Sequence, residues 1–194
     1  MSLLTKKYNW TPGSMHNDNH DYEVYKNHYK EDLLNYDSEI CTFNSKIDFR
    51  QRKFIRPTLD TKTFTGRVFD FYEWKSFLNS VSKSGVNMNT KIQVSSVKQL
   101  YNENRFWIVN GKIVTFSTYR IGGRQLQSYS LVENEAIEFV QKMIKKFQLA
   151  EAFVMDVAKT ENGYKIVECG CINCAGFYDS DLQELIIKLE NHFG

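Results

Sequence analysis

The sequence lacks any long hydrophobic run, and it has no excess of charge of one sign. A membrane-spanning helix needs roughly 20 predominantly apolar residues, and no stretch here approaches that length. The 25 basic residues nearly balance the 23 acidic ones and leave a formal net charge of +2. This charge predicts no nucleic-acid partner, because such proteins usually carry a strong basic patch. Internal repeats and low-complexity tracts are also absent.

A secretory signal is missing from the N-terminus as well. The first residues, MSLLTKKYNW, contain no apolar core of the kind that directs export. The four cysteines are therefore expected to be reduced thiols in a cytoplasmic protein. With 42% hydrophobic and 14% aromatic residues, the chain has far more apolar content than a disordered one. It suffices for one core, or for two small lobes that share a cleft.

The pattern of apolar residues predicts an α+β fold rather than a doubly wound parallel sheet. Asn110-Gly111 lies between two apolar runs and is a strong hairpin signal. Residues 1–20 and 59–66 are rich in turn-forming and polar residues and are expected to be irregular. The expected elements, in chain order, are a helix at 22–34, strands at 53–57 and 67–71, a helix at 74–81, strands at 91–97, 105–109 and 112–119, a helix at 133–147, strands at 152–158 and 164–169, and a helix at 181–193.

Two acidic residues lie inside the apolar strands of the last hairpin. Asp156 is part of FVMDVA, and Glu168 is part of KIVEC. Burying a carboxylate is costly unless it is paired or binds a cation, and acids on adjacent strands can lie opposite one another. Two such close like charges are stable mainly when a divalent ion bridges them. The alternative is that one acid pairs with Arg or Lys, or caps a turn.

The stretch FIRPTLDTKTFTG has the chemistry of a phosphate-binding loop. Arg56 ends a short strand, and Lys62 lies in the Thr- and Gly-containing loop that follows. A guanidinium offers a planar fork of donors, an ammonium offers a point charge, and the loop offers backbone N–H groups. The stretch matches neither the P-loop nor the dinucleotide fingerprint, so a surface turn with ordinary charges is the alternative.

Further charged residues lie on the central hairpin. Glu103 and Arg105 are two residues apart on a strand, so both side chains should point to the same face. They form either a weak surface ion pair or a charged pair that faces a cleft. Tyr119, Arg120 and Arg124, at the far end of the hairpin, could add positive charge for an anionic substrate.

A cysteine cluster forms the remaining motif. Cys169, Cys171 and Cys174 make a C-x-C-x-x-C pattern, but zinc sites usually need four ligands, often as two separated pairs. Cys41 and the four histidines lie far away in the sequence. A structural metal site, a small buried thiol at Cys169 and a nucleophilic thiol at Cys171 or Cys174 all stay open.

In their order and spacing, these pieces resemble the ATP-grasp superfamily. They are most similar to small phage and bacterial ATP-grasp proteins in which Arg-Pro takes the place of Lys-Pro on the first nucleotide-binding strand. The resemblance covers residues 54–182, about two thirds of the chain. Its matching stretches are FIRPTLDTKTFTGRVFDFYEW, ENRFWIVNGKIVTFSTYR, AFVMDVA and KIVECGCINCAGFYDSDL.

The resemblance implies a role for each site residue. Arg56 and Lys62 would hold the nucleotide phosphates, and Lys62 and Arg105 would serve catalysis. Glu103 would face the nucleotide. The backbone of IQVSS would read adenine through Gln93, Val94 and Ser95.

The resemblance also implies a magnesium site. Asp156 and Glu168 match its two acidic ligands. The family usually has Asn two residues after the Glu, where this chain has Gly170. Either Asn173 supplies the missing amide oxygen, or the site binds metal less tightly.

On this resemblance we expect two small α+β lobes with antiparallel sheets that enclose a nucleotide cleft. Residues 1–50 would be a reduced N-terminal segment, and 51–194 the nucleotide-binding domain, divided at about residue 95. The implied activity is an ATP- and Mg²⁺-dependent ligase that activates a carboxylate of a small molecule or peptide as an acyl phosphate. A second copy or a partner protein would complete the acceptor site. The alternatives are a non-catalytic nucleotide-binding module and a Cys-cluster metal-binding protein.

Overall fold

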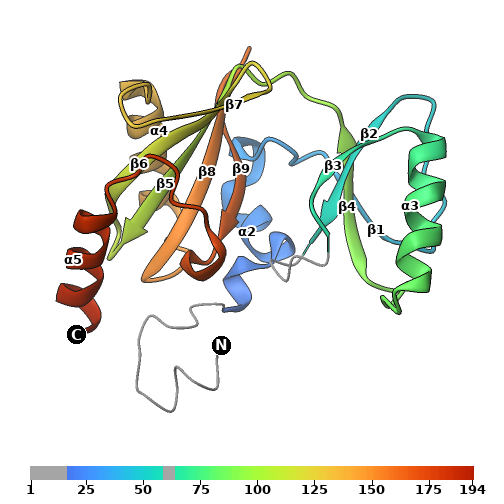
Figure 1. Cartoon of the computed structure of the whole chain (residues 1–194), viewed down its shortest axis with the longest axis horizontal. Helices are drawn as coiled ribbons and strands as arrows, with labels where there is room; N and C mark the ends of the chain where they lie inside the picture. The colour runs from blue at the N-terminus through green and yellow to red at the C-terminus, as the bar shows by residue number, and fades with distance from the viewer. Residues whose placement is uncertain (1–16, 59–63) are drawn as a thin grey trace.

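Two antiparallel sheets make up the two halves of the molecule, as Figure 1 shows. The computed structural model describes residues 17–58 and 64–194, without the side chain of Cys174. One sheet has four strands and the other has five, and helices pack against both. This arrangement confirms the predicted α+β fold class with two antiparallel sheets.

The small sheet has an aromatic core beneath a single long helix. Helix α3 (Phe71–Lys83) covers the side of this sheet that faces away from the large sheet (Figure 1). Asp70 caps α3 by accepting hydrogen bonds from the N–H groups of Tyr72 and Glu73. Phe43, Phe69 and Trp74 are buried between α3 and the sheet. The strands, in spatial order, are β1 (Glu39–Thr42), β4 (Lys91–Ser96), β2 (Lys53–Pro57) and β3 (Arg67–Phe69).

The large sheet is built from two hairpins and an edge strand. Asn110 and Gly111, with φ of 50° and 69°, form the predicted tight turn between β5 and β6. The connection between β8 and β9 likewise contains Gly163, with φ of 85°. The strands, in spatial order, are β7 (Arg124–Ser128), β6 (Lys112–Ile121), β5 (Asn102–Val109), β8 (Ala152–Thr160) and β9 (Gly163–Gly170).

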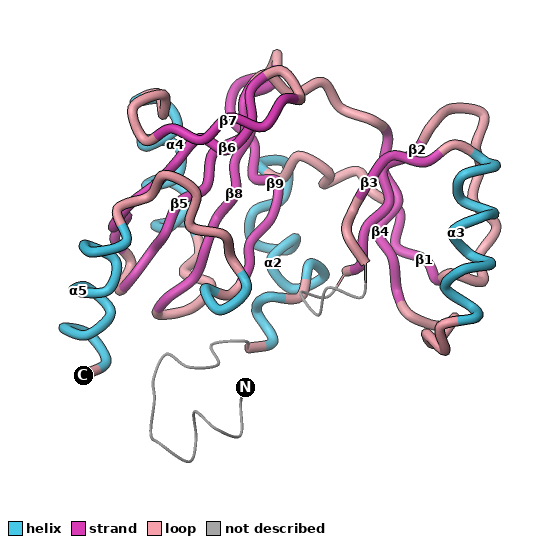
Figure 2. Tube along the Cα trace, viewed as in Figure 1, coloured by secondary structure: helices cyan, strands magenta, loops and turns pink. Residues whose placement is uncertain are grey.

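The two faces of the large sheet have different neighbours. On one face, Phe106, Phe153 and Met155 pack in a core shared with α2 (Tyr22–Tyr29) and α4 (Asn134–Lys146). On the other face, Trp107 and Val154 pack with α5 (Leu182–Phe193). Figure 2 shows α5 on the far side of the large sheet from the small half. Helix α5 covers only part of its face, so the charged residues further along β5 and β8 are left for another role.

The element predictions differ from the structure at a few places. Strands β1 and β7 were not predicted, because β1 has only four residues and β7 (RQLQS) lacks apolar alternation. The predicted helix at 22–34 ends at Tyr29, since Lys30 takes a positive φ of 51° and a 3-10 turn, Lys30–Asp32, follows. The predicted helix at 74–81 begins earlier, at Phe71, because of its Asp70 cap. Residues 1–16 lie outside the described part of the chain.

The segment before residue 51 contributes to both halves. Its β1 pairs with β4 of the small sheet, while α2 packs against the core of the large sheet. Leu34 N–H donates to the carbonyl of Ile166 on β9 over 2.8 Å. This segment is therefore part of both sheets' surroundings. None of the helices in the described ranges has the length and apolar character required to cross a bilayer.

A buried hydroxyl, that of Tyr22, ties this segment together, which gives a test of its contribution to stability. Tyr22 Oη donates to the carbonyl of Asn35 over 2.6 Å and lies 3.0 Å from Ser38 Oγ. Tyr22→Phe should lower the free energy of unfolding by about 1–2 kcal/mol, because both partners lose a buried hydrogen bond. Urea unfolding measures this change. Tyr36→Phe, at a residue 39% exposed, is the control and should change nothing; equal effects of both changes would contradict the assignment.

Candidate functional site

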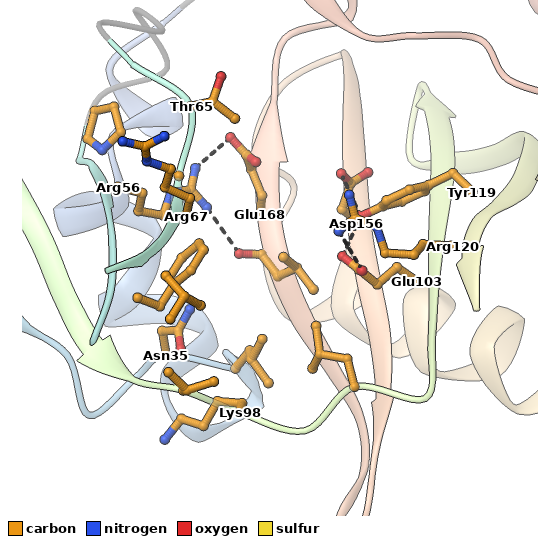
Figure 3. A pocket seen from close by; sticks show the side chains of 18 of the residues that line it. Asn35, Arg56, Thr65, Arg67, Lys98, Glu103, Tyr119, Arg120, Asp156 and Glu168 are labelled. Carbon is orange, nitrogen blue, oxygen red and sulfur yellow. Dashed lines mark hydrogen bonds and ion pairs between the residues drawn. The ribbon is translucent and has the colours of Figure 1, made fainter. Parts of the chain in front are cut away.

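A cavity of about 680 Å³ lies between the two sheets, and both halves supply its walls. Arg56 and Arg67 come from β2 and β3 of the small sheet, while Glu103, Asp156 and Glu168 come from the large sheet. Figure 3 shows these side chains projecting toward the space between the sheets. The cavity is therefore an interlobe cleft of the kind expected from the sequence.

The cavity wall is rich in charge. Five of its described residues are positive and three are negative, which leaves a net charge of +2. Such a wall favours an anionic ligand. The positive residues are Arg56, Arg67, Lys98, Arg105 and Arg120, and the negative ones are Glu103, Asp156 and Glu168.

Four of these charges form one row across three strands and the gap between the sheets. Strand pairing places Arg105 of β5 opposite Asp156 of β8, and Asp156 opposite Glu168 of β9. Arg56 of the small sheet then contacts Glu168. The two acids are therefore cross-strand neighbours, as the sequence indicated, and each one also pairs with an arginine.

Asp156 and Arg105 form a two-pronged ion pair. The Nε and Nη2 atoms of Arg105 donate to the two carboxylate oxygens of Asp156, each over 2.8 Å. The side chains are only 15% and 7% exposed. Burial alone would lower the pKa of Arg105, but its hydrogen bonds to Asp156 and the charge of that carboxylate raise this pKa above its ordinary value. Arg105 thus stays a cation inside the wall.

Arg56 connects the two halves of the molecule. Its Nη2 donates to Glu168 Oε1 over 2.5 Å, and its Nη1 donates to the carbonyl of Val167 over 3.3 Å. Gly66 allows this placement, because a Cβ there would lie 2.9 Å from Arg56 Cβ and 3.0 Å from Phe54 Cζ. A side chain at position 66 would displace one of these groups.

Glu103 has two partners deep in the wall. Its carboxylate accepts from Arg120 Nη1 over 2.8 Å and from Tyr119 Oη over 3.2 Å. Burial raises the pKa of Tyr119 well above its ordinary value, and the charges of Asp156 and Glu103 raise it further. The hydroxyl of Tyr119 therefore stays protonated and donates to either acid, its distance to Asp156 Oδ2 being 3.4 Å.

The three residues expected to read adenine do not line the cavity. Gln93, Val94 and Ser95 lie in the middle of β4, which pairs with β1 on one side and β2 on the other. Their backbone groups therefore serve the sheet. The wall is formed instead by the residues that leave the sheet next, Ser96, Val97, Lys98 and Leu100.

The other predicted residues have separate placements. Lys62 lies outside the described residues. Asn173 is exposed in the short 3-10 turn Ile172–Cys174 and is not part of the cavity wall. Arg124 begins β7 and is also away from the wall, whereas Tyr119 and Arg120 are part of it.

The cysteine motif does not lie in the cavity wall. Cys169 and Cys171 are buried as free thiols, and Cys169 belongs to the core beneath the large sheet. Within residues 17–58 and 64–194, no three His, Cys, Asp or Glu side chains that the structure describes gather as a metal site. The side chain of Cys174 is outside that description.

Some wall residues escaped the sequence analysis. Arg67 follows the polar loop at the start of β3, and alternation on that strand could have placed it beside Arg56. Asn35 and Tyr178 lie in irregular segments, where no periodicity assigns a direction to a side chain. Asn35 reaches the wall from the segment before residue 51.

The opposed acids fit a magnesium ion in their chemistry. Asp156 and Glu168 supply carboxylate oxygens from directly opposite positions, and both face the cavity. Mg²⁺ prefers such ligands, usually one or two carboxylates with phosphate oxygens and water. To hold the ion, each acid would exchange its arginine partner for it.

Comparisons with known proteins agree on the fold. A family model for an ATP-grasp domain, the third family of its clade, matches residues 6–189. Among solved structures, D-alanine–D-alanine ligase from Bacillus anthracis is similar with a TM-score of 0.63 at 12% identity, over 89% of this chain and 66% of that one. The same ligase complexed with ATP gives 0.63 at 14% identity, over 89% and 65%.

A more distant match is an L-amino acid ligase from Bacillus licheniformis. It has a TM-score of 0.51 at 9% identity and covers 80% of this chain and 41% of that one. The chain thus spans just under two thirds of the length of the D-alanine–D-alanine ligase. No curated protein matches the sequence.

The burial of the Arg105–Asp156 pair predicts a strong effect on stability. Arg105→Met leaves the Asp156 carboxylate buried without its cation, which should lower the free energy of unfolding by about 3–5 kcal/mol. The control is Arg50→Met, because Arg50 and Asp48 form a pair that is 90% and 54% exposed, and it should have no measurable effect. Denaturant unfolding compares the two variants. A loss at Arg105 no larger than that at Arg50 would show that the buried pair is not structural.

Proposed function

We propose that this chain, which belongs to the ATP-grasp domain family whose model it matches, binds ATP with Mg²⁺ and acts as a ligase. ATP would activate the carboxylate of a substrate as an acyl phosphate, which an amine or thiol then attacks. The observation that supports this most is the interlobe cavity, where an opposed pair of acids lies among five cations.

The cations suit a triphosphate. Arg56 and Arg105 reach the cavity from opposite halves and present planar forks of N–H donors, which match phosphate oxygens. A ligand held by both would join the two halves. Lys62, on the loop between β2 and β3, would add to this set as the resemblance implies.

The base would lie at the end of the cavity where the chain passes from β4 to β5. Val97 and Leu100 offer apolar surface there, and Leu34 lies on the same wall. The backbone from Ser96 onward has left the sheet, so its N–H and C=O groups are available to an adenine edge. We therefore move the adenine contact from residues 93–95 to residues 96–100.

Asp156 and Glu168 would hold the magnesium ion. When bound, the ion offsets the charge of the triphosphate and of the transferring phosphoryl group. Arg105 and Arg56 would then turn from the acids to the phosphates, which keeps every charge in this row paired. Asn173 and Gly170 remain the positions at which this site differs from the family's usual ligands.

The acceptor would enter beside Tyr119 and Arg120. Arg120 is 47% exposed in its side chain and donates to Glu103 through Nη1, so part of its guanidinium faces solvent. A carboxylate of an amino acid or a peptide suits this cation. Because the chain is shorter than the ligases it resembles, a second copy or a partner protein would complete this side of the cleft.

A non-catalytic nucleotide-binding module is the second candidate, favoured by Gly170 at the usual ligand position. Both candidates require ATP binding and differ only in turnover. They are distinguished by release of ADP when amino acids or peptides are added. Steady release that depends on an acceptor supports the ligase, and binding without release supports the module.

Thermal unfolding tests the nucleotide and metal assignment. Excess ATP with Mg²⁺ should raise the Tm by about 5 °C or more, because a ligand bound only by the folded state stabilises it. ATP with a chelator should give a smaller rise. In Asp156→Asn and Glu168→Gln, the part of the rise that depends on Mg²⁺ should vanish, measured from each variant's own ligand-free Tm.

The matched control for these variants is Asp48→Asn, which removes an exposed acid that is not part of the wall. It should keep the full Mg²⁺-dependent rise. An absence of any rise with the unaltered protein contradicts ATP binding. An unchanged rise in both acid variants contradicts the metal assignment alone.

A further inference from the structure

Tyr178 has an unusual backbone for a bulky residue. Its φ is 53°, in the left-handed region that glycine or asparagine usually occupies. Such a conformation costs about 1–2 kcal/mol and persists only where the surroundings impose it. The residue lines the cavity, although the chain around it, residues 175–181, is neither helix nor strand.

Hydrogen bonds fix the chain on both sides of Tyr178. Before it, the carbonyl of Gly176 accepts from Arg105 Nη1 over 3.2 Å. After it, the N–H of Asp179 donates to Ser117 Oγ over 3.2 Å, and its carboxylate accepts from the N–H of Tyr129 over 2.8 Å. These contacts tie the segment to β6 and to Arg105, and they force the turn at Tyr178.

The turn places an aromatic ring against a buried cation. The Tyr178 ring stacks on Tyr119 with centroids 5.0 Å apart and an angle of 15° between the planes. The Arg105 guanidinium carbon lies 5.0 Å from the Tyr178 centroid and 5.6 Å from the Tyr119 centroid. Both distances are within the range of cation–π attraction.

We propose that Tyr178 is a positioning residue that holds the Arg105 guanidinium in the cavity wall when Asp156 is not paired with it. The inference rests on the proposed function, in which Asp156 turns to a bound cation. Arg105 would then lose its two hydrogen bonds to Asp156 and keep the one to Gly176. The two rings and this carbonyl keep the guanidinium in place, with its freed N–H groups directed toward the ligand.

The ligand-free protein allows a direct test by ¹⁵N NMR of the Arg105 Nε–H group, identified by its loss in Arg105→Lys. Asp156→Asn supplies the state in which the carboxylate pair is broken, and Asp156→Ser is a second background in case the first folds poorly. In either background, adding Tyr178→Leu should speed the solvent exchange of this N–H about tenfold, because the Arg105 guanidinium then loses its desolvated cation–π contact.

Two further changes separate positioning from a general effect on the fold. Tyr178→Phe keeps the ring and should leave the exchange rate as it is. Phe177→Leu alters the neighbouring residue, whose ring stacks on Trp107 and is not part of the wall, and it should also leave the rate unchanged. Equal exchange with and without Tyr178→Leu overturns the proposal, as does a similar increase from Phe177→Leu.

ATP titration by calorimetry distinguishes this proposal from the proposed function. If the unaltered protein binds no ATP but the exchange results hold, the proposed function fails and the positioning role of Tyr178 stands. If ATP binds, Tyr178→Leu should weaken it about tenfold, and Tyr178→Phe should not. In the charge-neutral background Arg105→Gln/Asp156→Asn, the same Tyr178→Leu change should have no further effect. An equal loss there would overturn the proposal.

Discussion

The site depends on the need to pair charge inside a sheet. Asp156 lies in the middle of β8, and without Arg105 directly opposite it on β5 the carboxylate would be buried alone. The same register places Glu168 beside Asp156, and Glu168 in turn attracts Arg56 from the other sheet. A row of positive, negative, negative and positive groups therefore follows from strand pairing. Both acids are held next to arginines that a phosphate ligand could claim.

The large sheet uses its two ends for different purposes. On the face that carries Arg105, residues nearer the β5–β6 turn, such as Trp107 and Val109, are apolar and covered by α5. Because side chains alternate, the same face continues into Arg105 and Glu103, where the helix no longer covers it. The segment that follows the Ile172–Cys174 turn crosses the boundary between these two regions. It seals the core with Phe177 and contributes Tyr178 to the wall.

Local patterns were sufficient to predict most strands, the hairpin at Asn110-Gly111 and the neighbouring positions of Asp156 and Glu168. The pattern could not assign β7, because an edge strand exposed on both faces needs no apolar alternation. It misplaced the cavity contact at Gln93–Ser95, since only the pairing of β4 on both sides shows that its backbone is occupied. The role of Tyr178 depends on hydrogen bonds to β6, between residues about 60 positions apart, which no local pattern contains.

The chain enters the small sheet through residues 33–38 and leaves it through residues 97–101, so the two crossings behave as the leaves of a hinge. Both supply cavity wall, the first through Leu34 and Asn35 and the second through Val97, Lys98 and Leu100. The strand before the second crossing is tied to the first by Gln93 Nε2, which donates to Ser38 Oγ over 3.0 Å. A molecule that occupies this end of the cavity touches the axis about which the halves would rotate. Occupancy there selects among degrees of opening, because any change in the angle between the sheets alters its contacts.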